Sequence, residues 1–331
     1  MAVVSPSFAA PAMFPDVHDL AMRRLREELE LEPVEYPTTR RLDASPADRA
    51  ADLMDAFTDP DIHAVLATIG GSDQITVLPH LDPAAITVPK PFFGFSDNTN
   101  LLNWLWTHGI AGYHGGSTMV HLGRGGGLHP VSTASLRAAL FTGGDVVLRP
   151  AEEFSEDELD WNDPASLGRA APVQRGEGWI WHRPDRVVTG PTWGGCLEIV
   201  HWNLAAGRWI RPVADYAGCV LLVETSEMMP PAREVFHMLR NAGERGLLGQ
   251  FPAVLVGRAK ASALDRRTTP DVRVTYRAEQ REAVLRALEA YNPEAMAVFD
   301  VDFGHTDPQW VLPYGGTMTV DGPGRRIIAH Y

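Results

Sequence analysis

A serine in the sequence 94–98 (Gly-Phe-Ser-Asp-Asn) lies at the junction between an apolar run and a helix-forming run. Residues 91–95 predict a buried strand, and residues 100–108 predict a helix. A serine on so tight a turn is exposed above the sheet edge, where N–H groups of the next helix can face a developing oxyanion. Taken alone, the turn is more typical of a helix cap at Ser96 or Asp97, and only the residues described below make Ser96 a candidate nucleophile. The second glycine of the usual motif is replaced by Asn98, and a helix cap is the structural alternative.

A glutamate and a histidine further along the chain could complete the chemistry of such a serine. The apolar run 219–223 is typical of a buried strand and stops at Glu224, and His305 follows a glycine near the C-terminus. Serine is a poor nucleophile at neutral pH, so a histidine must take its proton while a carboxylate orients the imidazole. We therefore predict that Ser96 is the nucleophile, His305 the general base and Glu224 the orienting carboxylate.

Both partners of the serine also have structural interpretations. Glu224 could be a salt-bridge partner at a strand end. His305 could bind a metal ion together with Asp302 and Asp307, because imidazole and carboxylate groups are common ligands. We expect no metal and no cofactor, since a serine hydrolase with this triad needs neither. The remaining histidines are expected to be structural or exposed.

A glycine turn earlier in the chain is the candidate oxyanion site. Residues 61–69 lead through an apolar strand into Gly70 and Gly71. We predict that the N–H groups of Gly71 and Asp97 bind the oxyanion and that Gly70 contacts the substrate. Glycine is needed at this turn because a side chain would block the approach of the substrate carbonyl.

With these residues, the chain resembles a family of serine peptidases that includes murein LD-carboxypeptidases and microcin C immunity peptidases. The resemblance covers nearly the whole length and is carried by short motifs at residues 4–7, 68–71, 94–97, 194–197, 222–224 and 304–306. It implies that the family's Ser-Glu-His triad maps onto Ser96, Glu224 and His305. It also implies a homodimer, because relatives are commonly dimers.

Two branches of this family differ at the glycine turn. Murein-cleaving members carry Arg-Gly-Gly-Tyr-Gly, whereas the microcin-immunity branch carries Thr-Ile-Gly-Gly, the sequence of residues 68–71 here. Cys196 is a departure, because the family usually has an asparagine at this position. A small thiol cannot replace the donor and acceptor of an amide. We therefore expect Cys196 at the substrate, and a substrate that differs from that of the relatives.

The composition is that of a globular protein with about two domains. The chain has 331 residues, of which 45% are hydrophobic and 21% charged. Its formal net charge of −13 disfavours nucleic acid and anionic membranes as partners. No stretch approaches the ~20 apolar residues of a membrane span, and the N-terminus lacks the basic region of a targeting signal. With only two cysteines, we expect a soluble, cytoplasmic protein.

The order of the predicted elements indicates an α/β protein. In residues 1–143 strands alternate with helices, one of which begins at the capping sequence 45–48 (Ser-Pro-Ala-Asp). This alternation predicts a parallel sheet of the flavodoxin-like or Rossmann-like type, similar to that of amidotransferases. Ser96 is expected on a nucleophile elbow at the carboxyl edge of this sheet, where ligands of such sheets bind.

The rest of the chain is expected to form a connection and a second domain. Residues 144–190 are polar, and their acidic run 152–158 predicts a solvated loop. Residues 191–331 predict a mixed, β-rich α+β domain that carries Glu224 and His305. The active site should then form only where the two domains face each other.

Tryptophans are concentrated around the connection. Six of the nine lie between Trp161 and Trp209. Packing at the domain interface and stacking on a flat substrate group such as a nucleobase are both compatible with this pattern. In the second interpretation we predict that Trp179 or Trp181 lies near the substrate.

Three functions remain for comparison. The leading hypothesis is a serine peptidase or amidase that cleaves the amide between an aminoacyl or peptidyl group and a nucleotide-like moiety. The first alternative is a murein tetrapeptide LD-carboxypeptidase of cell-wall recycling, which the sequence at 68–71 disfavours. The second is a non-catalytic binding module on the same scaffold, against which the intact set of Ser96, Glu224 and His305 argues.

Overall fold

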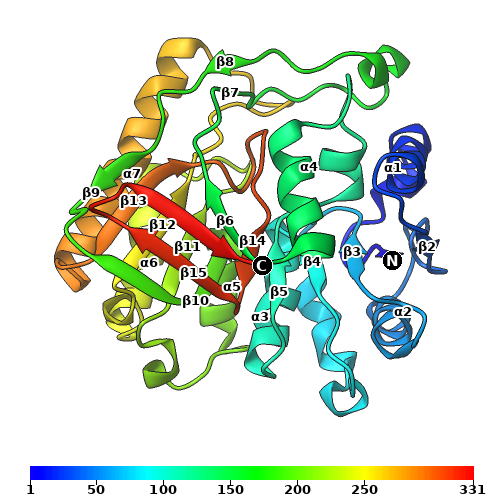
Figure 1. The fold of residues 1–331 in the computed structure, drawn as a ribbon, viewed down its shortest axis with the longest axis horizontal. Coiled ribbons are helices and arrows are strands. Elements are labelled where there is room, and N and C mark those ends of the chain that lie inside the picture. The colour runs from blue at the N-terminus through cyan, green and yellow to red at the C-terminus, as the bar shows by residue number, and fades with distance from the viewer.

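The computed structural model describes residues 1–331 and contains two main β-sheets, each with helices packed against it (Figure 1). The first sheet has the strand order β14-β5-β4-β3-β1-β2. Its strands are β1 (Ala2–Val4), β2 (Val34–Glu35), β3 (Val65–Ala67), β4 (Phe92–Gly94), β5 (Gly112–His114) and β14 (Leu312–Tyr314). All neighbouring strands are parallel except β14, which is antiparallel to β5. The parallel sheet predicted for this part of the chain is confirmed.

Four helices cover the two faces of the first sheet: α1 (Pro15–Glu27), α2 (Pro46–Thr58), α3 (Thr99–Thr107) and α4 (Pro130–Arg137). Alternate residues of a strand point to opposite faces. Val4 and Phe92 accordingly share a hydrophobic cluster with residues of α2 and α3, whereas Phe93 shares another with residues of α1 and α4. Ser45 caps α2 in the capping box expected from the sequence.

The second sheet is mixed and has the strand order β6-β16-β15-β10-β11-β12-β13-β9. Its strands are β6 (Asp145–Leu148), β9 (Ile180–His182), β10 (Val187–Cys196), β11 (Val220–Glu224), β12 (Ala253–Gly257), β13 (Met296–Val301), β15 (Thr317–Asp321) and β16 (Arg326–His330). Strands β10 to β13 are parallel, and the remaining pairings are antiparallel. The accompanying helices are α5 (Leu197–Ala206), α6 (Ala232–Glu244) and α7 (Pro270–Tyr291).

Each sheet contains strands from segments that lie far apart in the sequence. Strands β6 and β9 come from the segment expected as a connection and form the two edges of the second sheet, whereas β14 extends the first sheet. The connection also contains the short hairpin of β7 (Glu153–Phe154) and β8 (Gln174–Arg175). None of the helices is both long and apolar enough to cross a membrane.

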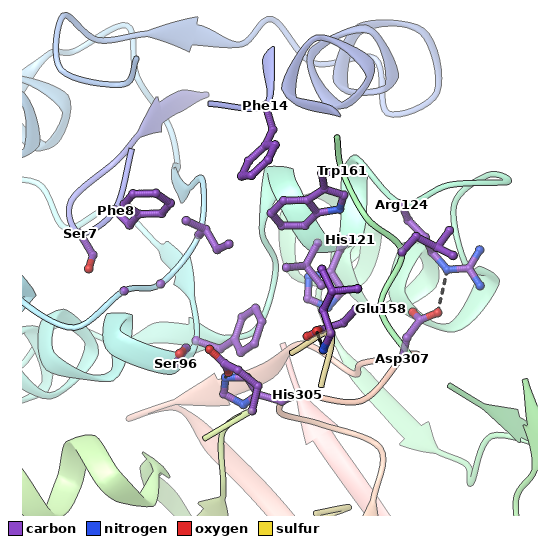
Figure 2. A pocket seen from close by; sticks show the side chains of 18 of the residues that line it. Ser7, Phe8, Phe14, Ser96, His121, Arg124, Glu158, Trp161, His305 and Asp307 are labelled. Carbon is purple, nitrogen blue, oxygen red and sulfur yellow. Dashed lines mark hydrogen bonds and ion pairs between the residues drawn. The ribbon is translucent and has the colours of Figure 1, made fainter. Parts of the chain in front are cut away.

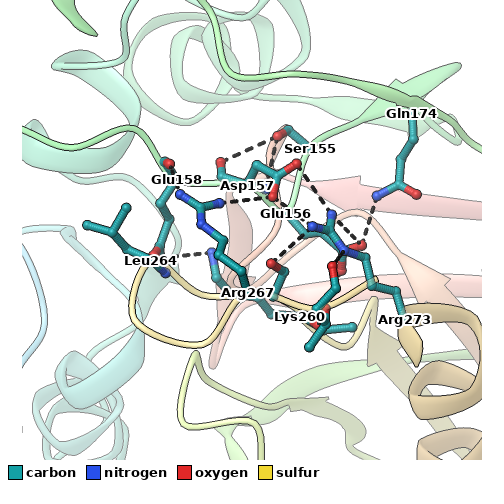
Figure 3. A network of polar contacts seen from close by, with 12 residues as sticks. Ser155, Glu156, Asp157, Glu158, Gln174, Lys260, Leu264, Arg267 and Arg273 are labelled. Atoms are coloured by element: carbon teal, nitrogen blue, oxygen red, sulfur yellow. Dashed lines mark hydrogen bonds and ion pairs between the residues drawn. The ribbon is translucent and has the colours of Figure 1, made fainter. Parts of the chain in front are cut away.

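The acidic run of the connection is solvated only at Glu152 and Glu153; for residues 156–158 the expectation of a solvated loop was wrong. Glu156 is only 1% exposed and pairs with Arg273 and Arg277 of α7, at 3.4 and 2.8 Å. Figure 3 shows Asp157 and Glu158 in the same network, where the Asp157 carboxylate accepts from Arg273 and Arg267 and the Glu158 carboxylate pairs with Lys260. The arginines lie more than 100 residues downstream, so the local sequence could not reveal that these charges are neutralised by pairing.

Candidate active site

Ser96 occupies a strained turn at the end of β4. It begins a 3₁₀ turn, Ser96–Asn98, that leads into α3, and its φ of 60° lies in the left-handed region that non-glycine residues rarely adopt. Backbone strain of this kind clusters at functional sites. The turn therefore has the strand-to-helix geometry predicted from the sequence, and it directs Ser96 into a pocket.

Gly70 lies directly against this serine. A Cβ atom at residue 70 would be 2.8 Å from Ser96 Cβ and 2.9 Å from its Oγ, closer than real contacts allow. At Gly71 a Cβ would be 2.1 Å from Ser7 Oγ. The N–H of Gly71 makes no backbone hydrogen bond. The glycine turn thus packs against Ser96 and Ser7 more closely than a larger residue would allow.

Asp97 stabilises the turn with its side chain. Its buried carboxylate accepts hydrogen bonds from Ser7 Oγ at 2.5 Å, from the N–H of Gln74 at 2.9 Å and from Asn100 Nδ2 at 2.8 Å. These contacts join the glycine-turn region to the start of α3. The main-chain N–H of Asp97 lies close to Gly70, since a Cβ atom on Gly70 would be 3.1 Å from it.

His305 and Glu224 form a buried pair. The Nδ1 atom of His305 donates to Glu224 Oε2 at 2.6 Å, and Nε2 makes no hydrogen bond within the protein. Glu224 ends β11, and the histidine loop reaches it through Gly304, where a Cβ atom would be 2.7 Å from Glu224 Oε2. This arrangement fixes the imidazole and leaves Nε2 without a hydrogen-bond partner, and His305 lines the same pocket as Ser96.

The electrostatics of this pair favour a charged carboxylate. Burial raises the pKa of Glu224, but the charge of His305 and the contacts with His114 and His305 outweigh it and lower the pKa to about 2. Burial lowers the pKa of His305, whereas Glu224 and, to a smaller extent, Glu227 raise it to about 9. Glu224 therefore stays ionised and stabilises a protonated imidazole at position 305.

Two histidines at this site were expected only to be structural or exposed. His114, at the end of β5, is completely buried, with Nε2 3.6 Å from the second oxygen of Glu224. His121 lines the pocket, and burial lowers its pKa to about 4, so it is neutral. The strand-end position of His114, next to the strand that carries Ser96, is the sequence signal that could have identified it.

Ser96 and His305 lie at one end of a pocket of about 790 Å³. Figure 2 shows them opposite a group of aromatic side chains, Phe8, Phe14 and Trp161. The Phe14 and Trp161 rings meet edge to face, with centroids 5.3 Å apart. The pocket thus joins polar, reactive groups at one end to an aromatic wall at the other.

Three residues expected at the substrate lie elsewhere. Trp179 donates through Nε1 to Asp302, and Trp181 lies in the edge strand β9, so neither lines the pocket. Cys196 is 1% exposed, and its thiol faces Glu198 at 3.4 Å. Of these tryptophans it is Trp161, from the loop after the acidic run, that lines the pocket. The sequence did not indicate which of the clustered tryptophans would do so.

The carboxylates proposed as metal ligands beside His305 have other partners. Asp302 pairs with Arg258 and Asp307 with Arg124, each at 2.7 Å. Nowhere in the chain do three or more His, Cys, Asp or Glu side chains form a group that could hold a metal ion. The geometry gives the metal interpretation of His305 no support.

Comparisons with known proteins match both parts of the chain. The LD-carboxypeptidase N-terminal domain matches residues 1–115, and the LD-carboxypeptidase C-terminal domain matches residues 189–320. The microcin C7 self-immunity protein MccF of Escherichia coli is 23% identical over 291 residues, covering 85% of this chain and 77% of its own. The murein tetrapeptide carboxypeptidase of Pseudomonas aeruginosa is 33% identical over 141 residues, or 40% and 42% of the two chains.

Solved structures share the whole fold. An MccF-like protein from Streptococcus pneumoniae in complex with AMP superposes with a TM-score of 0.87 and 25% identity, covering 100% of this chain and 98% of its own. MccF in complex with aspartyl sulfamoyl adenosine superposes with a TM-score of 0.84 and 20% identity, covering 100% and 95%. The expected architecture, a parallel-sheet first part followed by a β-rich second part, is that of these proteins.

Proposed function

The chain belongs to the LD-carboxypeptidase family of serine peptidases, and we propose that it hydrolyses an amide with Ser96, His305 and Glu224 as its triad. Membership of this family makes it a serine hydrolase that acts on peptide-like bonds. The assignment of the three residues is supported by the strained turn at Ser96 and by the 2.6 Å contact between His305 and Glu224.

In the proposed reaction, Ser96 Oγ attacks the carbonyl carbon of the scissile amide while His305 Nε2 takes the hydroxyl proton. The N–H groups of Gly71 and Asp97 stabilise the negative charge on the carbonyl oxygen. His305 then returns the proton to the departing nitrogen, and the C–N bond breaks to leave an ester on Ser96. A water molecule, deprotonated by His305, hydrolyses this ester and restores the serine.

For the substrate, we propose an aminoacyl or peptidyl group joined to a nucleotide-like moiety. The observation that carries this proposal is the aromatic wall of Phe14 and Trp161, in the same pocket as Ser96 and His305. A tryptophan face is a suitable surface for stacking of a nucleobase. The S. pneumoniae relative in complex with AMP supports the same substrate class.

The alternative substrate is a murein tetrapeptide, which the similarity to the P. aeruginosa carboxypeptidase supports over part of the chain. The two are separated by incubating the purified protein with aminoacyl-sulfamoyl-adenosine or with murein tetrapeptide and quantifying products by mass spectrometry. We expect release of the amino acid from the adenosine compound at a rate far above that of D-alanine release. Faster cleavage of the tetrapeptide would reverse the assignment.

A further inference from the structure

The pocket is lined by six acidic residues, and four of them are paired with arginine or lysine side chains. The acidic residues that line it are Asp73, Asp157, Glu158, Asp160, Glu227 and Asp307. Asp160 accepts hydrogen bonds from its loop neighbour Asn162. The only charged partner of Glu227 is His305.

Glu227 lies at the reacting end of this pocket. Its Oε2 atom is 3.2 Å from His305 Nε2, the atom that must take the proton of Ser96, but the two form no hydrogen bond. Its side chain is 51% exposed and borders the pocket. The carboxylate of Glu227 therefore lies beside the general base at the border of the pocket.

The loop that carries Glu227 is held in place on both sides. Oε1 of the buried Glu198 accepts from the N–H of Ser226 at 2.9 Å and from its hydroxyl at 2.7 Å. The Ser226 hydroxyl in turn accepts from the N–H of Met228 at 3.2 Å. Glu227 thus belongs to a fixed turn, residues 226–229, that places it at the border of the pocket.

We propose that Glu227 is a specificity residue that binds the α-ammonium group of the acyl part of the substrate. The inference rests on the function proposed above, because it concerns the same Ser96 and His305. When the carbonyl carbon is within reach of Ser96 Oγ, the α-nitrogen, two bonds away, falls within a few ångströms of His305 Nε2, next to Glu227. An ammonium group there pairs with the Glu227 carboxylate in place of His305, whereas an acylated nitrogen offers this carboxylate no new cation.

The same contact also affects the general base. In the empty pocket the negative charge of Glu227 favours the protonated imidazole of His305, which cannot accept the proton of Ser96. A bound ammonium group neutralises the charge of Glu227 beside His305 Nε2, the atom that has to take the proton of Ser96. Substrates with a free α-amine are therefore bound more tightly, and they also favour the neutral imidazole of His305 that catalysis requires.

The test compares alanyl-sulfamoyl-adenosine with its N-acetyl derivative, because the α-amine is then the only cationic group that differs. We expect the wild type to favour the free amine about ten- to a hundredfold in kcat/KM, as for a charge-assisted hydrogen bond. Glu227→Gln should lose most of this preference and still cleave both compounds. Glu234→Gln, an exposed glutamate of α6 outside the pocket, is the matched control and should keep it.

An unchanged preference in Glu227→Gln, or no preference in the wild type, would overturn the role of Glu227 and leave the proposed function standing. Cleavage of neither compound by the wild type would overturn the proposed function. A binding measurement then decides on Glu227 separately: by calorimetry, Ser96→Ala should bind the free amine more tightly than the acetylated compound, and Ser96→Ala/Glu227→Gln should bind both equally. Equal binding to Ser96→Ala itself would contradict the inference.

Discussion

At the residue scale, the site depends on side chains whose surroundings are fixed before any substrate arrives. Ser96 is held at a φ of 60°, and His305 is oriented by a 2.6 Å contact with the buried Glu224. Because these groups need no rearrangement, they are suited to nucleophilic attack. The same rigidity makes the effect of single substitutions predictable.

Ser96→Ala should abolish hydrolysis and preserve the fold. No other hydroxyl in the strained turn can replace Oγ, so we expect kcat to fall by at least about 10⁴-fold. Rates measured with excess enzyme, together with a thermal unfolding curve, check this result. Activity close to that of the wild type with an unchanged melting temperature would show that the nucleophile is another residue.

The pH profile should report the raised pKa of His305. The general base must be neutral, so for an N-acetylated substrate, whose nitrogen does not titrate, kcat/KM should increase with pH and level off above about 9, the pKa of His305 in the free protein. Glu224→Gln removes the negative charge that raises this pKa, so the inflection should move to lower pH while kcat decreases. An inflection that stays in place in Glu224→Gln would mean that Glu224 does not act on the titrating group.

At the element scale, long-range ion pairs hold the connection against α7. Glu156 is buried between Arg273 and Arg277, and its second oxygen accepts from the N–H of Ala261 at 2.9 Å. Because Asp157 and Glu158 of this network line the pocket themselves, the network also holds part of the pocket wall in place.

Glu156→Ala should therefore destabilise the protein. Removing the buried carboxylate leaves Arg277 without an acidic partner and Arg273 with Asp157 alone, and loss of one partner of a buried pair typically costs about 3 kcal/mol. Glu152→Ala, in the same acidic run but exposed, should change the free energy of unfolding by less than about 0.5 kcal/mol. Urea unfolding of both variants checks the difference, and equal effects would contradict the structural role of Glu156.

At the scale of the whole molecule, the site exists only because two sheets meet. Ser96 and the glycine turn come from the first sheet, whereas Glu224 and His305 follow strands of the second. Trp161 comes from neither sheet but from the segment between them. The pocket therefore combines three parts of the chain, each with a separate role.

Trp161→Ala should separate the substrate-binding wall from the catalytic end. Loss of a stacking surface should weaken binding of an adenosine-containing analogue about tenfold. Trp179→Ala, which removes a tryptophan outside the pocket, should leave this affinity unchanged. A fluorescence titration measures both, and equal affinities for the wild type and Trp161→Ala would remove the main physical support for the nucleotide moiety.

Much of this protein could be determined from its sequence alone. The strand, tight turn and helix around Ser96, the glycine turn at Gly70 and the capped start of α2 follow from local chemistry, because neighbouring residues decide them. The family could also be identified, since its short motifs lie in order along the chain.

Only the tertiary structure decided which residues surround these groups. His114, Glu227 and Trp161 were not singled out, because their roles depend on which side chains face one pocket. Glu156 was expected in solvent, because its arginine partners are more than 100 residues away. Local sequence specifies how a segment folds, whereas burial and pairing of a charge depend on packing between segments that the chain order does not reveal.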